Sequence, residues 1–372
     1  MIDDNTLISF VSMPDVTEDG RINTSVNRPF GEVKKGYTIF QEGDILFAKI
    51  TPCMENGKGA QAIGLRNGIG VGSTEFHVLR PDPYYLDGTW LYYLTAWSKF
   101  RREAEIHMTG SAGQKRVPKA FLEEYQVEIP TLIDQKDQVE RLNRIKRIIT
   151  SRQHQLLVLD SLIKARFVEM FGEPDTNPKC WVEKTLSDML DVLGGYAFKS
   201  DGFSEEDGIP VLRIGNINAG FFKPVNMVFW EEDDNLKRYI MYPGDLVMSL
   251  TGTVGKDDYG NVCILGEEYN KYYLNQRNAK LELKKGLDKY YLSQLLRFEK
   301  IKKRLTGISR GVRQANISNR DILGLRVPVP PVELQKQYAV FVSQVDKSKA
   351  AVQKALEKTQ LLFDSLMQEY FG

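Results

Sequence analysis

The chain has 372 residues, of which 42% are apolar and 27% are charged, and its formal net charge at pH 7 is +1. Such a composition is typical of a globular protein with two or three domains, and it excludes disordered and fibrous classes. No apolar run approaches the roughly 18 residues of a membrane span, and the opening residues, MIDDNTLISF, lack the basic and apolar parts of a signal peptide. We therefore expect a cytoplasmic protein with no membrane segment.

Residues 1–131 are predicted to form a first globular domain. Three strand-like runs are separated by segments rich in Gly, Pro and Asn, and they lie at residues 7–11, 44–50 and 76–79. One helix is predicted over residues 86–106. A loop over residues 108–117 follows, and then a short strand that ends at Pro130.

Residues 132–172 predict one long helix, because no Pro or Gly interrupts them before Gly172. Apolar side chains recur along it every seven residues, at Leu142, Ile149, Leu156, Ile163 and Met170. At about 1.5 Å per residue, some 38 helical residues would span roughly 55 to 60 Å. A helix of that length needs a partner along its seam.

The second half of the chain offers that partner. Residues 173–180 are rich in Pro, Asp and Asn and indicate a linker, residues 181–330 predict a second globular domain, and residues 331–372 predict a second long helix. This helix carries the same apolar spacing, at Val345, Val352, Leu356 and Phe363. We predict that the two helices pair as an antiparallel coiled coil; the alternative is that each helix packs only on its own globule.

The second half repeats the plan of the first half about 200 residues later. Residues 43–45, Gly-Asp-Ile, return as Gly-Asp-Leu at 244–246, and the Phe-Gly pair at 171–172 returns at 371–372. Residues 181–208 have no counterpart, which predicts that the first globule lacks about 28 residues at its beginning. The matches predict a pseudo-twofold tandem repeat.

Each half offers the two kinds of group that DNA binding needs, which are cations for phosphates and planar donors or acceptors for base edges. Arginine pairs with guanine, and glutamine or asparagine pairs with adenine. Glycine-containing loops hold these residue types, namely Gln114, Lys115 and Arg116 in the first half and Arg310, Arg313, Gln314 and Asn316 in the second. Because the loops recur at equivalent positions, we assign them to DNA binding rather than to plain surface turns.

A second candidate surface follows a predicted strand in each half. It comprises Lys49, Asn56 and Lys58 in the first half, and Thr251, Lys256 and Arg277 in the second. We expect Asn56-Gly57 to form a tight turn that presents Lys58 and Glu55.

Residues 297–326 carry nine Lys or Arg side chains against Glu299 and Asp321, which is a net charge of +7. A basic strip on a nearly neutral chain suits a polyanionic partner. The alternative for residues 297–304 is a solvated helix face, which explains that part of the strip equally well.

Groups for catalysis are scarce. Residues 251–256 resemble a phosphate-binding loop, but Leu250 and Asp257 occupy positions that require Gly and Ser or Thr. The three histidines and three cysteines are isolated, which argues against a metal site or a disulfide framework. Asp257 or Asp258 together with Glu282 would suit a Mg²⁺-dependent nuclease, although a half-exposed strand explains residues 280–284 better. We expect no catalytic residue, metal or cofactor in this chain.

Several runs resemble one family. The chain is similar to specificity subunits of type I restriction-modification systems over essentially its whole length, apart from the shorter beginning. The runs that carry this resemblance lie at residues 46–58, 72–76, 110–117, 167–172 and 274–277. The resemblance implies an α+β fold in which two target recognition domains are joined by two long antiparallel coiled-coil helices.

The resemblance also implies partners. The chain would read a bipartite target in double-stranded DNA, two methyltransferase subunits that bind S-adenosylmethionine would pack on the helices, and restriction subunits would add ATP- and Mg²⁺-dependent activity. The outward helix faces would then be partner surface, namely Arg144, Arg147, Gln155, Lys354 and Lys358. Two other hypotheses are an autonomous Mg²⁺-dependent nuclease with duplicated DNA-binding domains, and a coiled-coil scaffold that binds no nucleic acid.

Overall fold

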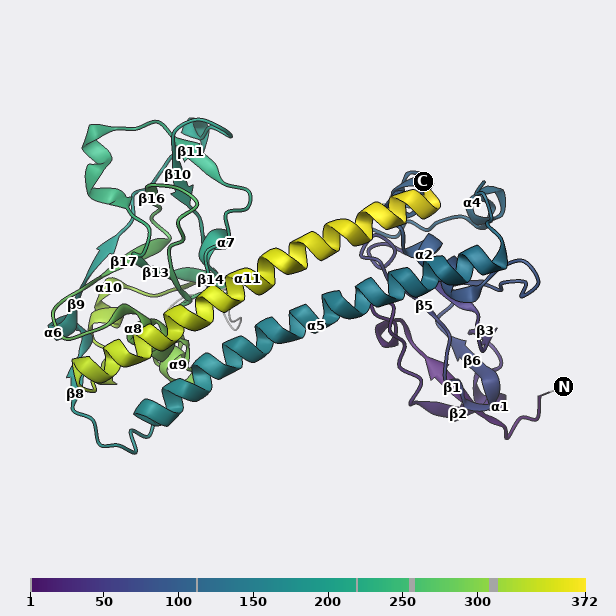
Figure 1. Ribbon diagram of the computed structural model, residues 1–372, viewed down its shortest axis with the longest axis horizontal. Helices are drawn as coiled ribbons and strands as arrows, with labels where there is room; N and C mark the ends of the chain where they lie inside the picture. Colours follow the sequence, from purple (N-terminus) through teal and green to yellow (C-terminus); the bar gives the residue numbers. More distant parts are fainter. Residues whose placement is uncertain (1, 112, 219, 254–257, 308–313) are drawn as a thin grey trace. The chain divides into compact units, whose positions relative to one another are not determined.

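The computed structural model describes residues 2–111, 113–218, 220–253, 258–307 and 314–372 (Figure 1). The chain divides into two compact units: unit 1 contains Met1–Gln153 and Gln353–Gly372, and unit 2 contains His154–Val352. Two helices of 40 residues, α5 (Leu132–Phe171) and α11 (Val332–Phe371), contribute one end to each unit. Each unit is therefore a globule closed by parts of both long helices.

Unit 1 is built on two small sheets. The first has the strand order β2-β1-β6-β3 and comprises β1 (Leu7–Val11), β2 (Asn27–Pro29), β3 (Thr38–Gln41) and β6 (Ile69–Gly72). The second has the order β5-β4-β7 and comprises β4 (Ile45–Ala48), β5 (Gly59–Gln61) and β7 (Phe76–Leu79). The shorter helices of this unit are α1 (Phe30–Val33), α2 (Gly88–Ala96), α3 (Ser98–Ile106) and α4 (Lys119–Glu124), with 3-10 turns η1 (Met13–Asp15) and η2 (Arg66–Gly68).

Unit 2 has two larger sheets and two strand pairs. One sheet, β11-β10-β16-β12, comprises β10 (Ile209–Leu212), β11 (Val228–Trp230), β12 (Ile240–Met241) and β16 (Tyr272–Leu274). The other, β15-β13-β17-β9, comprises β9 (Leu190–Gly194), β13 (Leu246–Ser249), β15 (Val262–Ile264) and β17 (Asn278–Leu283). The pairs are β8 (Glu183–Thr185) with β19 (Arg326–Pro328), and β14 (Thr251–Thr253) with β18 (Gln314–Asn316). Its shorter helices are α6 (Leu186–Met189), α7 (Ile214–Ile217), α8 (Lys289–Arg297), α9 (Glu299–Thr306) and α10 (Asn319–Leu323), with 3-10 turns η3 (Ser200–Gly202) and η4 (Asp234–Tyr239).

The two units share one topology. β1 runs parallel to β6 and antiparallel to β2, and β10 runs parallel to β16 and antiparallel to β11. Unit 2 has β8, α6 and β9 in addition, and these elements have no counterpart among the described residues of unit 1. The predicted tandem repeat of mixed helix and sheet is confirmed.

The long helices run antiparallel within each unit (Figure 1). In unit 1, Arg152 of α5 donates hydrogen bonds to the Ala355 carbonyl and the Thr359 hydroxyl of α11. In unit 2, Lys349 Nζ lies 2.6 Å from Asp160 Oδ1, and Tyr338 donates to the Ile163 carbonyl at 3.3 Å. The helices thus contact each other as well as the globules.

The predicted seam residues lie on the covered sides of these helices. Leu142 is fully buried, and Ile149, Ile163 and Val345 are also buried. Leu156, Val352, Leu356 and Phe363 are half-buried. The seam is most completely covered where a globule packs against it, because globule side chains add to the helix contacts there.

One predicted helix, residues 86–106, is wrong in its continuity. It consists of α2 and α3, which are separated at Trp97, where φ is −63° and ψ is 133°. Phe298 interrupts α8 and α9 in the same way, with φ −63° and ψ 127°. Both aromatic side chains are buried, so the break turns a large ring into the core; the periodicity of the sequence does not reveal it.

The predicted strand that ends at Pro130 is absent, since residues 126–130 form no strand. In unit 2 the equivalent residues form β19, and β19 is a strand because it pairs with β8. Unit 1 has no counterpart of β8 within its described residues, and an extended segment without a partner has no ladder of hydrogen bonds to define it.

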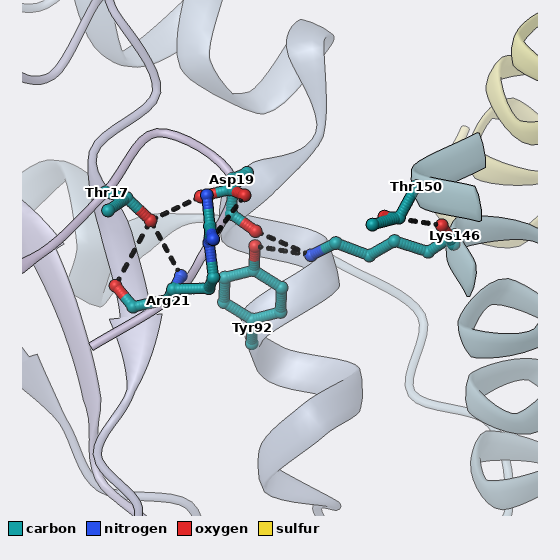
Figure 2. A network of polar contacts seen from close by, with 6 residues as sticks. All are labelled: Thr17, Asp19, Arg21, Tyr92, Lys146 and Thr150. Atoms are coloured by element: carbon teal, nitrogen blue, oxygen red, sulfur yellow. Dashed lines mark hydrogen bonds and ion pairs between the residues drawn. The ribbon is translucent and has the colours of Figure 1, made fainter. Parts of the chain in front are cut away.

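α5 is fastened to unit 1 by a lysine that reaches into the first globule. Figure 2 shows Lys146 pointing toward Tyr92 of α2 and toward the 17–21 turn. Its Nζ atom donates to the Asp19 carbonyl at 2.8 Å and to the Tyr92 hydroxyl at 3.3 Å, and it lies 5.1 Å from the Tyr92 ring centroid. The turn approaches Tyr92 closely, because Gly20 has a φ of +84° and a Cβ there would meet the Tyr92 hydroxyl.

Gly20→Ala is therefore expected to destabilise the protein. The added methyl group is strained at positive φ and collides with Tyr92, and the cost should be about 1 to 3 kcal/mol. The matched control is Gly36→Ala, because Gly36 has a φ of +81° but no atom within 4 Å of the added Cβ. Thermal unfolding followed by circular dichroism should show a lower Tm for the Gly20 variant than for the Gly36 variant, and equal Tm values would contradict this account.

Candidate nucleic-acid interface

Three segments of unit 1 meet at the ends of its strands. The chain after β4 is joined to the turn after β6, because the Lys49 amide donates to the Glu75 carbonyl at 2.9 Å. It is also joined to the 114–117 segment, because the Thr51 amide donates to Lys115 at 3.0 Å and the Val117 amide donates to Lys49 at 2.9 Å. The sequence predicted two of these segments as separate candidate surfaces, and the structure brings them together.

An ion pair between Arg116 and Glu75 organises this site. Arg116 Nε lies 2.9 Å from Glu75 Oε2, Arg116 Nη2 lies 2.8 Å from Glu75 Oε1, and Arg116 Nη1 donates to the Gln114 carbonyl at 3.0 Å. The hydrogen bonds from the guanidinium lower the pKa of Glu75 below its ordinary value, because they favour the carboxylate. The pair presents a fixed carboxylate and a fixed guanidinium side by side.

The other predicted residues of unit 1 differ in their exposure. Gln114, Lys115 and Asn56 are exposed, and Lys49 is half-buried. The predicted turn at Asn56-Gly57 is present, with a φ of +92° at Gly57. Lys58, however, does not project from it, since its Nζ atom donates to the Met13 carbonyl at 3.1 Å. A lysine that fastens two loops is a poorer phosphate contact than the exposed Lys115.

Unit 2 builds the same backbone arrangement with different side chains. The Leu250 amide donates to the Arg277 carbonyl at 2.8 Å, and the Ile317 amide donates to Leu250 at 2.8 Å. Arg277 and Asn316 therefore occupy the positions that Glu75 and Arg116 occupy in unit 1. Both side chains are exposed. Equivalent positions thus carry a carboxylate and a guanidinium in one unit, and a guanidinium and an amide in the other.

Arg277 lies between two hollows of unit 2. One is lined by Ile214, Asn218, Thr251, Gly252, Thr253, Asp258 and Arg277. The other includes Arg213, Asn216, Asn275, Gln276 and Arg277. In the first hollow, Asn218 Oδ1 and Thr251 Oγ1 are buried but have no hydrogen-bond partner within the described part of the chain. Buried polar atoms nearly always have a partner, so these two atoms suit a polar ligand or ordered water.

Some predicted residues lie outside the described residues. They are Lys256, Arg310 and Arg313. The backbone of Gln314 is described as part of β18, where Thr253 pairs with Gln314. Sequence reasoning missed Asn218 and Arg213, because neither belongs to a basic loop or to a strong motif.

The basic stretch at 297–326 is partly neutralised within unit 2. Lys300 and Arg304 each lie 2.9 Å from a carboxylate oxygen of Asp175, Lys303 lies 2.5 Å from Glu299, and Lys302 donates to Asn261 Oδ1 at 2.6 Å. These contacts favour the helix-face interpretation for residues 300–304 and leave Arg277 as the better candidate for a nucleic-acid contact.

The residues considered for a nuclease do not form a metal site. In the described ranges, no group of three or more His, Cys, Asp or Glu side chains is arranged to hold a metal ion. Lys280 Nζ lies 3.0 Å from Asp245 Oδ2 and 3.6 Å from Glu282 Oε1. β17 is the half-exposed strand that the alternating pattern predicted, and its charges pair with one another.

Comparison with known proteins identifies the family. A family model described as Type I restriction modification DNA specificity domain matches residues 2–159 and 178–360. The chain belongs to this family. The resemblance predicted from the sequence is confirmed, and the two matches fall on the two halves of the tandem repeat.

Relatives in this family match to different extents. The EcoAI specificity subunit of Escherichia coli is 41% identical over 157 residues, which cover 42% of this chain but only 26% of that subunit. The MjaVIII specificity subunit of Methanocaldococcus jannaschii is 26% identical over 359 residues, covering 88% of this chain and 80% of the relative. A solved type I restriction-modification S subunit from M. genitalium has the same fold, with a TM-score of 0.54, 15% identity and coverage of 100% of this chain and 95% of that chain.

No helix in the described ranges is both long enough and apolar enough to span a membrane.

The Arg116 and Glu75 pair leads to a prediction about pH. Arg116→Gln should raise the pKa of Glu75 toward its ordinary value, because the guanidinium is the main cause of the lowered pKa. Since the folded-state pKa is depressed, the stability contributed by the pair is present at neutral pH and is lost as the pH falls through that pKa. Carbon-13 NMR titration of the Glu75 carboxyl measures the change, and Lys115→Gln, a neighbouring exposed cation, should leave the pKa of Glu75 unaltered.

Proposed function

We propose that this chain is the DNA-recognition subunit of a type I restriction-modification complex and that each unit reads one half of a split target in double-stranded DNA. The observation that supports this most strongly is the duplicated site. Two family matches coincide with two units, and each unit joins equivalent loops through equivalent backbone hydrogen bonds. A twice-used scaffold with different side chains at the same positions suits the reading of two different sequences.

The chemistry of the two sites suits base edges in the major groove. In unit 1, Glu75 offers acceptor oxygens beside the donors of Arg116, and Lys115 lies next to them in the chain as an exposed cation for phosphate. In unit 2, the exposed side chains of Arg277 and Asn316 are of the types that pair with guanine and adenine. Phosphate contacts position the protein, and base contacts specify the sequence.

This proposal assigns the chemistry of restriction and modification to other subunits. S-adenosylmethionine would bind to two methyltransferase subunits, and ATP and Mg²⁺ would serve the methyltransferase and restriction partners in the cytoplasm. The chain would act without catalytic groups of its own, by placing a target base where a partner enzyme reaches it. The paired charges around Glu282 give no support to the nuclease hypothesis.

The outward faces of the long helices suit protein partners. In unit 2, α5 exposes Leu157, Val158 and Leu162 at 65%, 50% and 45% of their surface. In unit 1, α11 exposes Leu361 and Leu362 at 72% and 51%. The predicted partner residues Arg144, Arg147, Gln155, Lys354 and Lys358 are exposed as well. Apolar side chains rimmed by charged ones are typical of interface patches, and we assign these faces to the methyltransferase subunits.

Arg277→Ala tests the reading of DNA. Binding of the complex with its methyltransferase subunits to a set of targets, each changed at one base pair, should show relaxed preference at one half-site and unaltered preference at the other. The loss at the affected base pair should be about 1 to 3 kcal/mol if the arginine contacts guanine through two hydrogen bonds. Arg238→Ala, which removes an exposed cation of η4 that lines neither hollow, is the matched control. A uniform loss at both half-sites would count against base reading by Arg277.

Leu157→Asp combined with Leu162→Asp tests the partner surface. Because both side chains are exposed, the double variant should unfold at nearly the same temperature as the unaltered chain, while its association with the methyltransferase subunit weakens by at least about tenfold. Analytical ultracentrifugation of the mixture measures this. Ser151→Asp adds a charge at another exposed position of α5 and should associate normally; undiminished association of the double variant would refute the assignment.

A further inference from the structure

A strand–helix–strand segment covers one side of unit 2. β8 pairs with β19, α6 follows directly, and β9 pairs with β17 in an antiparallel ladder from Gly194 opposite Ala279 to Leu190 opposite Leu283. The apolar side chains of this segment enter the core, since Leu186 and Leu190 are fully buried and Met189 is 4% exposed. The segment therefore completes both a sheet and a hydrophobic core.

Unit 1 has the surface that this segment would cover, but the described residues of unit 1 include no cover. Strand pairing defines the equivalent positions, because Ile45 pairs with Leu79 as Leu246 pairs with Leu281. β7 pairs with β4 along one edge, and no described strand pairs with its other edge. The residues equivalent to β19 likewise form no strand.

Burial of equivalent side chains records the same difference. Leu281, Leu287, Ile322, Leu325 and Val327 are all buried in unit 2, with exposures from 0% to 8%. Their counterparts in unit 1, which are Leu79, Leu86, Leu122, Tyr125 and Val127, are all half-buried. Ile129, beside them in the chain, is 53% exposed. We call this set, with the free edge of β7, the open face of unit 1.

We propose that the open face of unit 1 is a docking surface for a strand–helix–strand segment of a partner polypeptide, with the apolar pattern that Leu186, Met189 and Leu190 provide in unit 2. The partner segment would pair its second strand antiparallel to β7 and its first strand with residues 126–128. Addition of a strand to a free edge supplies main-chain hydrogen bonds, and the half-buried side chains supply apolar contact. This proposal does not rest on the proposed function, because it concerns only how the fold of unit 1 is completed.

A second copy of this chain is a poor source of the segment. Its own residues 183–194 already fill the core of its own unit 2, where Leu186 and Leu190 have no exposed surface. Withdrawing two buried leucines would cost about as much as truncating them, roughly 2 to 5 kcal/mol each. A partner that carries an uncommitted segment of this pattern meets no such cost.

The end of α11 indicates where such a segment would start. In unit 2 the Trp181 indole donates to the Phe171 carbonyl at the end of α5, at 2.9 Å, and so fastens the beginning of the covering segment. In unit 1, Phe371 stands at the equivalent end of α11, packed 4.9 Å from the Trp90 ring. An aromatic donor ahead of the first strand is therefore part of the expected pattern.

The chain's own residues 173–197 provide the probe. A synthetic peptide of this sequence, with Cys180→Ser to prevent disulfide formation, is mixed with the full chain, and backbone amide exchange is followed by mass spectrometry. Exchange at residues 77–80 and 126–129 should slow by about tenfold when the peptide is present at about ten times its Kd, because binding then competes with opening. The same residues should be protected when the peptide sequence is instead fused after Gly372.

Two controls make the result decisive. A peptide with Leu186→Asp and Leu190→Asp keeps the polar character and length but loses the apolar anchors, and it should give no protection. Val127→Asp in the full chain should abolish protection by the unaltered peptide. Absence of protection by both the free and the fused segment overturns the proposal, as does equal protection by the double-Asp peptide. Protection that rises with the concentration of the chain alone would assign the face to a second copy and would also overturn it.

Discussion

Each globule depends on the ends of two helices that lie far from it in the chain. The core of unit 1 includes Leu142 from α5 and Met367 and Phe371 from α11. The core of unit 2 includes Ile163, Phe167 and Phe171 from α5 and Tyr338 from α11. Burial of a phenylalanine is worth about 3 to 5 kcal/mol, so a globule without its helix ends would lose a large share of a typical folding free energy. The helices are part of both cores, and this constraint explains why 40 residues stay helical without a break.

A scaffold fixed in this way leaves the strand ends free to differ. The same three backbone segments meet in both units, joined by hydrogen bonds from Lys49 or Leu250 to the turn beyond β6 or β16. The side chains at those ends have no part in the core, and they have diverged from Glu75 and Arg116 to Arg277 and Asn316. A buried Val or Leu in the adjoining strands tolerates no such exchange, because the interior is close-packed. The fold therefore separates what must stay constant from what can specify a sequence.

Much of this organisation could be predicted from the sequence. β1 and β7 occupy the predicted residues, because their apolar runs end at turn-forming residues, and the heptad seam predicted both long helices. What failed depended on tertiary contacts. The sequence does not tell that Trp97 turns into the core, that Lys58 reaches the Met13 carbonyl, or that residues 126–130 lack a partner strand. At the site, Lys115 and Arg277 stood out by charge and position, whereas Asn218 did not, because only folding leaves its Oδ1 atom buried without a hydrogen bond.

The unequal completeness of the two units has a physical explanation in where their cores lie. In unit 1 the largest apolar cluster joins α2, α3 and the two long helices, with Trp90 and Phe100 almost fully buried at its centre. That cluster is formed without the surface that β8, α6 and β9 cover in unit 2, where Leu186 and Leu190 belong to the main core itself. The cost of an uncovered face falls instead on five half-buried side chains and one short strand edge. A four-residue edge strand such as β7 exposes few unpaired backbone groups, so unit 1 keeps its fold while retaining an edge to which another strand can add.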